Sequence, residues 1–172
     1  ANSLSQNTAV GTQSLQESHS SNNSAFGYQA LLNNTTGSGH NTALGYEAMR
    51  STTDADTNTA VGASALYTNQ SGDRNTAIGY EALYTSNVDM DAFNVAVGYQ
   101  AGRAHTTGYF NTICGGEAAK AMTTGLANVA VGVAALGGAT TASNCVCVGK
   151  DAGLSITTGG GNTCVGEDAG DR

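Results

Sequence analysis

The pentapeptide Asn-Thr-Ala-Val-Gly recurs, with small variations, about every seventeen residues along the whole chain. Each copy closes on a glycine, and the spacings between successive closing glycines are 16, 18, 17, 17, 19, 17, 17, 17 and 17 residues. A fixed period over a whole chain indicates one structural unit stacked on copies of itself. The sequence therefore predicts a solenoid of about ten rungs, with residues 1–172 forming a single domain without distinct caps.

The rungs are expected to be built from strands. A repeat of two helices needs more than about 30 residues, and the abundance of Gly and Thr disfavours helices. We therefore predict an all-β parallel solenoid, or β-roll, whose rungs lie about 4.8 Å apart. Each rung should contain a strand before the glycine and a second short strand after it, with the glycine at the corner because it tolerates positive φ.

Three columns of stacked residues define the expected rung. The residue before each glycine is apolar, and this valine column is the predicted structural core: Val10, Phe26, Leu44, Val61, Ile78, Val97, Cys114, Val131, Val148 and Val165. The predicted corner glycines are Gly11, Gly27, Gly45, Gly62, Gly79, Gly98, Gly115, Gly132, Gly149 and Gly166. An asparagine opens nearly every pentapeptide, which predicts an amide ladder of Asn7, Asn23, Asn41, Asn58, Asn75, Asn94, Asn111, Asn128 and Asn162.

The period-2 geometry of a strand assigns these columns to two faces. The residue three before each glycine, mostly Thr or Val, shares a face with the valine column and forms the threonine column. The residue two before each glycine, mostly Ala, shares the opposite face with asparagine and forms the alanine column. We expect the valine and threonine columns to point into the core.

Charge composition excludes several classes of partner. The chain has six basic and thirteen acidic residues, a net charge of −7, whereas nucleic-acid binding requires clustered Lys and Arg. Interaction with anionic membrane surfaces is disfavoured for the same reason, and no apolar stretch approaches the length of a membrane-spanning helix. We expect neither nucleic-acid binding nor membrane insertion.

Residues that could support catalysis are scattered. His19, His40 and His105 fall in loops at different phases of the repeat, so they are expected to be exposed and unstacked. No catalytic arrangement of Ser or Cys with His follows from these positions. An acidic column two residues after the glycines should face solvent, and it lacks the spacing of a calcium-binding loop. Its members are Glu47, Glu81, Glu117, Asp151 and Asp168. We predict a protein that is not an enzyme and has no catalytic residues, metal site or cofactor.

Cysteines are confined to the C-terminal third. Cys147 and Cys164 occupy the same column on successive rungs, where neighbouring Cα atoms lie within disulfide range, and Cys145 lies two residues from Cys147. A disulfide among Cys145, Cys147 and Cys164, three free thiols, and a metal site are the alternatives. Cys114 is expected to be a buried thiol.

Two nonapeptides carry a resemblance to known fibres. Residues 41–49, Asn-Thr-Ala-Leu-Gly-Tyr-Glu-Ala-Met, and residues 75–83, Asn-Thr-Ala-Ile-Gly-Tyr-Glu-Ala-Leu, resemble repeats of phage tail fibres and of trimeric autotransporter adhesin heads. The resemblance implies a left-handed β-roll that packs as three chains and serves adhesion or spans distance. It also implies a location outside the cell, on its surface or on a virion, with a homotrimer and a glycan or protein receptor as partners. The longer period of this chain departs from the adhesin repeat.

Two other functions remain open at this stage. A short rod with open ends could stack head to tail into an extracellular filament. Ice binding by a flat threonine array is a lesser alternative, because the threonine column is expected to line the core and gives way to Val95, Val129 and Val146.

Overall fold

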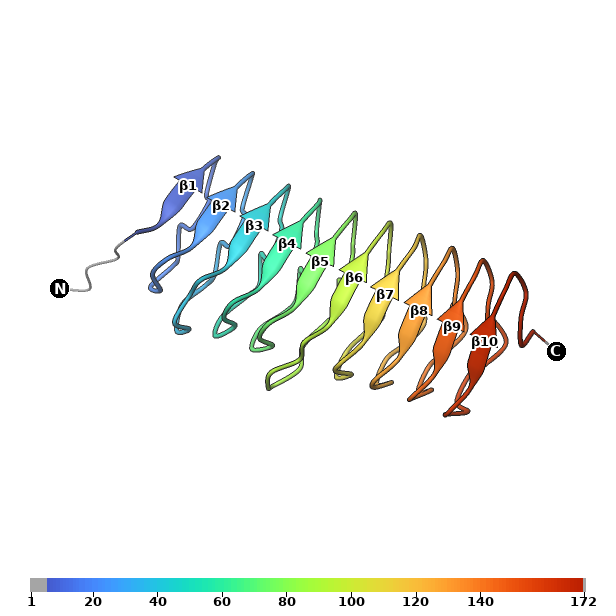
Figure 1. The fold of residues 1–172 in the computed structure, drawn as a ribbon. Helices are drawn as coiled ribbons and strands as arrows, with labels where there is room; N and C mark the ends of the chain where they lie inside the picture. Colours follow the sequence, from blue (N-terminus) through green and yellow to red (C-terminus); the bar gives the residue numbers. More distant parts are fainter. Residues whose placement is uncertain (1–5, 172) are drawn as a thin grey trace.

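A computed structural model describes residues 6–171 and confirms the parallel β-solenoid (Figure 1). Each rung contributes one three-residue strand: β1 (Thr8–Val10), β2 (Ser24–Phe26), β3 (Thr42–Leu44), β4 (Thr59–Val61), β5 (Thr76–Ile78), β6 (Val95–Val97), β7 (Thr112–Cys114), β8 (Val129–Val131), β9 (Val146–Val148) and β10 (Thr163–Val165). The strands form one parallel sheet in sequence order. None of the described residues belongs to a helix long and apolar enough to span a membrane.

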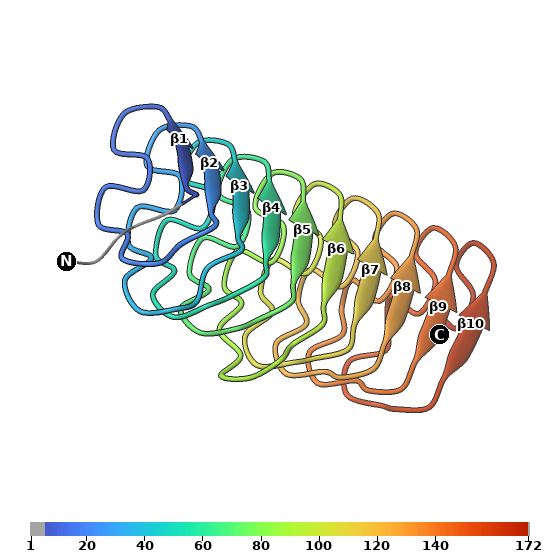
Figure 2. The ribbon, with the colours of Figure 1, turned by 60° about the vertical axis from the view of Figure 1, so that its left-hand side comes forward.

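Register stacks like residues on like. Thr59 of β4 pairs with Thr76 of β5, and Ala60 pairs with Ala77. The same alignment holds along all ten strands, which form one side of the coil while turns and loops close the rest (Figure 2). The longest spacing, between Gly79 and Gly98, is absorbed by a loop between β5 and β6 that extends beyond its neighbours (Figure 1).

The valine column lies on the outer face of the sheet, so the predicted core is wrong. Val10, Leu44 and Val165 retain 56, 48 and 69% of their surface exposed. The corrected column, exposed or half-buried throughout, comprises Val10, Phe26, Leu44, Val61, Ile78, Val97, Cys114, Val131, Val148 and Val165. Strand periodicity shows which residues share a face but does not show which face is enclosed. Here the enclosed face is the one with the smaller residues.

Alanine and leucine columns form the actual core. The alanine column is completely buried at Ala25, Ala43, Ala60, Ala77, Ala96 and Ala130. A second column, four residues after each corner glycine, is completely buried at Leu31, Met49, Leu66, Leu83 and Leu136. The coil is narrow, so a small residue from the strand is matched by a large one from the opposite wall.

Where a larger residue replaces alanine in the strand, a smaller residue replaces leucine on the opposite wall. Ile113 replaces Ala in the strand, and the leucine column of the preceding rung holds Gly102. A Cβ built on Gly102 would lie 3.0 Å from Cδ1 of Ile113. Cys147 is likewise accompanied by Gly153, whose Cβ would lie 2.6 Å from Sγ of Cys147. Core volume is therefore maintained across the rungs, as close packing requires.

The second strand predicted after each glycine is replaced by turns. Gln29 and Leu31 have φ of 53° and 50°, which is left-handed backbone that cannot belong to a strand. Gln29 N–H donates to Thr12 O of the preceding rung, and Leu31 N–H donates to Ala48 O of the next, both at 3.0 Å. These hydrogen bonds offset conformational strain of about 1–2 kcal/mol per left-handed residue. The stacked neighbours, and not the local sequence, therefore impose this conformation.

The corner glycines are confirmed. All ten have positive φ, from 124° at Gly166 to 146° at Gly45. For nine of them, from Gly11 to Gly149, an added Cβ would overlap the carbonyl oxygen of the corner glycine in the next rung. Glycine is required here both by backbone conformation and by the close approach of the stacked rungs.

Candidate functional site

The outer face of the sheet is the principal candidate site. It consists of the valine column and the threonine column, which place two outward side chains on each of the ten strands. None of these positions carries a charge. Val10, Phe26, Leu44, Ile78 and Val95 are between 38 and 56% exposed. The face is therefore uncharged along all ten strands, with apolar side chains in the valine column and hydroxyl side chains at seven positions of the threonine column.

Aromatic residues follow the outer face on the C-terminal side of the strands. Tyr28, Tyr46, Tyr80 and Tyr99 directly follow the corner glycines and are 42 to 55% exposed. Tyr28 stacks on Tyr46 and Tyr80 on Tyr99, in each pair with ring centroids 5.4 Å apart. This tyrosine column adds exposed aromatic surface next to the strands in four rungs, whereas the same position holds Lys150 and Glu167 in the last two rungs.

A second aromatic cluster lies on the N-terminal side of the strands. Phe93 and Phe110, which directly precede the asparagines of two successive rungs, have ring centroids 5.8 Å apart and are 45 and 55% exposed. The Arg74 guanidinium lies 5.3 Å from the centroid of the Phe93 ring. Exposed apolar surface thus borders the outer face on both sides.

The acidic column faces solvent only in part: Glu117 and Asp168 are exposed, whereas Glu47, Glu81 and Asp151 are half-buried. Glu81 accepts hydrogen bonds from Nε2 of Gln100 at 2.8 Å and Nε of Arg103 at 2.6 Å. Burial acts to raise the pKa of Glu81, but the hydrogen bonds from Arg103 and Gln100 outweigh it and lower the pKa. Neutral residues separate most of the stacked carboxylates, which reduces repulsion between rungs.

The asparagine ladder is confirmed from Asn7 to Asn128. In each step Oδ1 of one asparagine accepts a hydrogen bond from the backbone N–H of the equivalent residue in the next rung, at 2.8 to 3.2 Å. The backbone is thus the principal donor, in place of the expected chain of side-chain amides. Cys145 interrupts the ladder, so the Asn162 side chain has no amide partner in the preceding described rung and instead donates to Cys145 Sγ, at 3.7 Å.

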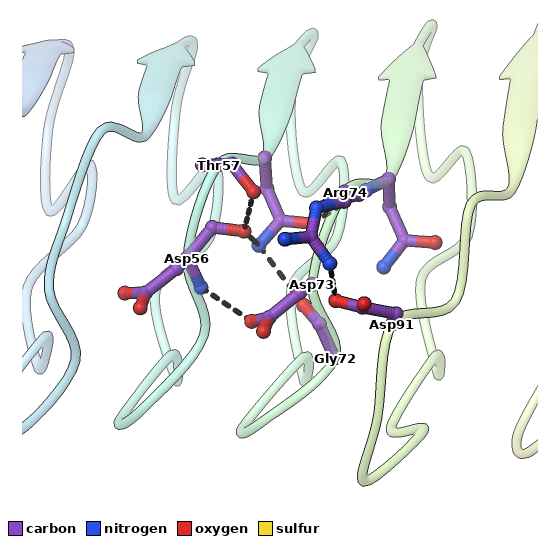
Figure 3. A network of polar contacts seen from close by, with 8 residues as sticks. Asp56, Thr57, Gly72, Asp73, Arg74 and Asp91 are labelled. Carbon is purple, nitrogen blue, oxygen red and sulfur yellow. Dashed lines mark hydrogen bonds and ion pairs between the residues drawn. The ribbon is translucent and has the colours of Figure 1, made fainter.

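A polar network links the loops of rungs four to six (Figure 3). The Asp56 N–H donates to Oδ1 of Asp73 at 2.7 Å, and Arg74 forms an ion pair with Asp91. Burial is the largest effect on Asp73 and raises its pKa. Within residues 6–171 no group of three His, Cys, Asp or Glu is arranged to hold a metal ion. The network joins neighbouring rungs by hydrogen bonds and an ion pair between their own residues.

The cysteines differ from one another in exposure. Of the three alternatives for Cys145, Cys147 and Cys164, the structure has free buried thiols, although Cys147 and Cys164 are register partners. Cys114 is exposed on the outer face, contrary to the expectation that it is buried. Cys114 belongs to the valine column, and its side chain points outward with the rest of that column.

We expect a thiol reagent to modify Cys114 alone in the dilute folded chain. Burial, together with the neighbouring Cys164, raises the pKa of the Cys147 thiol to about 12, and the thiolate is the reactive form. Labelling followed by peptide mass mapping should find the three buried cysteines modified only after unfolding. Rapid modification of Cys147 in the folded chain would contradict this arrangement.

His105 is buried, contrary to the sequence expectation, whereas His19 and His40 are exposed as predicted. Nε2 of His105 lies 3.2 Å from Nδ2 of Asn111, and burial lowers the pKa of His105 to about 4. The position of His105 in a loop did not predict its burial. Its position within the repeat did, because His105 lies seven residues after a corner glycine, as do Asn34 and Asn69, which are also buried.

Stability should therefore depend on pH through His105. Between about pH 6.5, the ordinary pKa of the imidazole, and about pH 4, its pKa in the fold, the unfolded chain binds a proton that the folded chain does not. The free energy of unfolding then falls as the pH falls through this window, by about 3 kcal/mol in total. Chemical denaturation of the native chain and of His105→Asn at pH 7.5 and 4.5 checks this. The variant should lose most of the pH dependence, and an unchanged dependence would contradict the assignment.

Comparison with known proteins assigns this chain to no family. No protein-family model matches the chain, and neither a curated protein nor a solved structure shows significant similarity to it.

Proposed function

We propose that this chain is a non-enzymatic, rigid rod of an extracellular fibre, on a virion tail or a cell surface, and that its outer face packs laterally against copies of itself. The observation that supports the proposal most is the uncharged outer face, which places an exposed or half-buried apolar side chain of the valine column on each of the ten strands. Exposed apolar surfaces of this extent mark interaction sites in soluble proteins.

The size of the face suits an interface between chains. Ten strands about 4.8 Å apart, each three residues long, present on the order of 450 Å². The tyrosine column and the Phe93–Phe110 cluster enlarge the apolar surface toward the roughly 800 Å² that each partner contributes to a standard interface. A face of this area could hold copies of the chain together without charged contacts.

Charge favours a copy of the chain as the partner. Two chains that each carry a net charge of −7 repel one another, so a stable contact between them requires a neutral surface. The outer face is such a surface, whereas the acidic residues lie in the loops, in the acidic column and at Glu167. The resemblance to tail fibres and adhesin heads favours three chains, whose rows of loops would contact a glycan or protein receptor with multiplied avidity.

Native mass spectrometry of the chain over a range of concentrations tests this proposal. The chain should form a three-chain species, and Ile78→Asp, which places a charge on the outer face, should shift it to single chains. Thr124→Asp is the matched control, because Thr124 is an exposed loop residue outside the strands and its stacked equivalents Thr107 and Thr141 are uncharged. Single chains at every concentration, or equal behaviour of the two variants, would contradict lateral packing.

A head-to-tail filament is the alternative assembly. Within residues 6–171, β1 pairs only with β2 and β10 pairs only with β9, so each end strand has a free edge. A contact between opposite ends would propagate without closing. Electron microscopy that shows long filaments, unaffected by Ile78→Asp, would favour this assembly over lateral packing.

Ice binding is a second candidate function, because the outward orientation of the threonine column removes the reason for placing it in the core. Thr42, Thr59 and Thr76 stack in register on exposed or half-buried positions. Phe26 and Leu44 make the neighbouring column uneven, which favours a protein interface over a regular lattice. Thermal hysteresis at micromolar concentrations of single chains would support ice binding.

A further inference from the structure

A column of buried polar side chains extends inside the first six rungs. The residues lie seven positions after each corner glycine, and all are at least 95% buried: Ser18, Asn34, Thr52, Asn69, Ser86 and His105. In the next three rungs the same position holds Met122, Ala139 and Ile156. The interior of the rod is thus polar along one line in its N-terminal part and apolar along the same line afterwards.

Each member of this polar column has an atom with no hydrogen-bond partner among the described residues. The atoms are Ser18 Oγ, Asn34 Nδ2, Thr52 Oγ1, Asn69 Oδ1, Ser86 Oγ and His105 Nδ1. A buried polar atom without a partner costs about 1–3 kcal/mol, and such atoms are rare in folded proteins. Six in one column on consecutive rungs indicate a shared partner.

Asn75 Nδ2, the remaining unpartnered buried atom, has a separate cause. The equivalent amides of Asn58 and Asn94 donate to the carbonyls of Gly72 and Gly108, at 2.9 and 3.1 Å. In the rung of Asn75, the 19-residue spacing alters the loop that would supply this carbonyl. The polar column therefore needs its own explanation.

Rung spacing prevents neighbours in the polar column from bonding directly but suits a bridging water. Equivalent atoms of adjacent rungs lie about 4.8 Å apart, well beyond a hydrogen bond. Two hydrogen bonds of about 2.8 Å that meet at a water oxygen at a near-tetrahedral angle span about 4.6 Å. One water molecule between two rungs therefore fits the repeat of the solenoid.

Alternation in side-chain size provides the room. The larger Asn34, Asn69 and His105 alternate along the column with the smaller Ser18, Thr52 and Ser86. A small residue leaves unfilled part of the space that its larger neighbours occupy in their own rungs. Water molecules beside Thr52 and Ser86 would each have three polar partners, within the 2–4 that buried waters make.

Donor and acceptor roles are complementary at these two positions. Asn69 Nδ2 donates to Gly72 O at 2.7 Å, so its free Oδ1 can accept from a water on either side. Asn34 Oδ1 accepts from Asn23 Nδ2 at 3.4 Å, which leaves Asn34 Nδ2 to donate. The hydroxyls of Thr52 and Ser86 can take either role.

We infer that the polar column holds a file of ordered water molecules between the rungs, with waters beside Thr52 and Ser86, and that the file ends at Met122. Met122 ends the file because it is completely buried at the next position of the column and offers only a weak sulfur acceptor, which already accepts from Asn128 Nδ2 at 3.4 Å. The waters belong to the hydrogen-bonded core, and the C-terminal rungs are dry along the same line.

The isosteric substitution Thr52→Val tests this inference by the sign of its effect. If a water bridges Asn34, Thr52 and Asn69, removing the hydroxyl takes one partner from that water, and the Tm should fall by about 2–4 °C. If Thr52 Oγ1 has no partner at all, removing a buried unsatisfied hydroxyl should raise the Tm or leave it unchanged. That outcome would overturn the inference.

A matched control and a direct measurement complete the test. Thr124→Val changes an exposed loop threonine and should leave the Tm unchanged, and circular dichroism should show that both variants fold. A high-resolution crystal structure of the native chain should contain ordered waters within hydrogen-bonding distance of Thr52 Oγ1 and Ser86 Oγ. Dry space there, or side chains turned to bond protein carbonyls, would equally overturn the inference.

Discussion

Ala60→Asp is expected to unfold the rungs around β4, whereas Val61→Asp leaves them folded. Ala60 is completely buried in the narrow core, and its neighbour Val61 is half-buried on the outer face. A buried carboxylate without a partner costs several kcal/mol, which is a large part of the usual 5–15 kcal/mol of folding stability. Circular dichroism and thermal unfolding of the two variants measure the difference.

Val61→Asp is the matched control for this experiment, since it adds the same charge one residue away. Its Tm should fall by only a few degrees in single chains, and its main effect should be weaker association. If Val61→Asp unfolds the chain and Ala60→Asp does not, the inner and outer faces have been assigned in reverse.

Gly79→Ala should be nearly as damaging as the buried charge. Gly79 has φ of 138°, and an added Cβ would overlap the carbonyl oxygen of Gly98. Backbone strain and forced separation of the rungs together should cost about 3 kcal/mol or more. Denaturant unfolding measures this loss.

Gly116→Ala is the control for the corner glycine. No atom lies within 4 Å of a Cβ added there, and Tyr28, Tyr46, Tyr80 and Tyr99 occupy the same position in other rungs. Its stability should change by less than about 0.5 kcal/mol. Equal effects of the two substitutions would show that close approach of the rungs does not decide the outcome.

The period of the sequence was sufficient to predict the parallel solenoid, its register, the corner glycines and most of the asparagine ladder. Each of these features depends on a residue that recurs at the same position of the repeat. In a stack of rungs, residues at the same position of successive repeats lie next to one another. The ladder ends where Cys145 replaces asparagine, an interruption that is visible in the sequence.

The direction in which the columns point could not be obtained from period alone. Hydrophobicity favoured the valine column as the core, yet the coil encloses Ala60 and Leu66 and leaves Val61 on the outer face. The leucine column was a signal that could have corrected this, because in six of the ten rungs it supplies a large apolar residue from the opposite wall of the coil. Cys114 was misplaced for the same reason as the valines.

Local propensity also failed after the corner glycines and at His105. Glu47 and Met49 adopt φ of 53°, a conformation that their side chains disfavour in isolation and that hydrogen bonds from neighbouring rungs stabilise. His105 looked like an exposed loop residue until its phase aligned it with Asn69 and Ser86. In both places the stack of rungs overrides what the local sequence favours.

The outer face can be tested as the contact between chains by measuring the alkylation rate of Cys114 at increasing protein concentration, together with the native mass. Cys114 is the thiol on the outer face, so it should react rapidly in dilute single chains and become protected as a three-chain species forms. Slow reaction at every concentration would contradict the outward orientation of this face. Rapid reaction in the assembled species would contradict its use as the contact between chains.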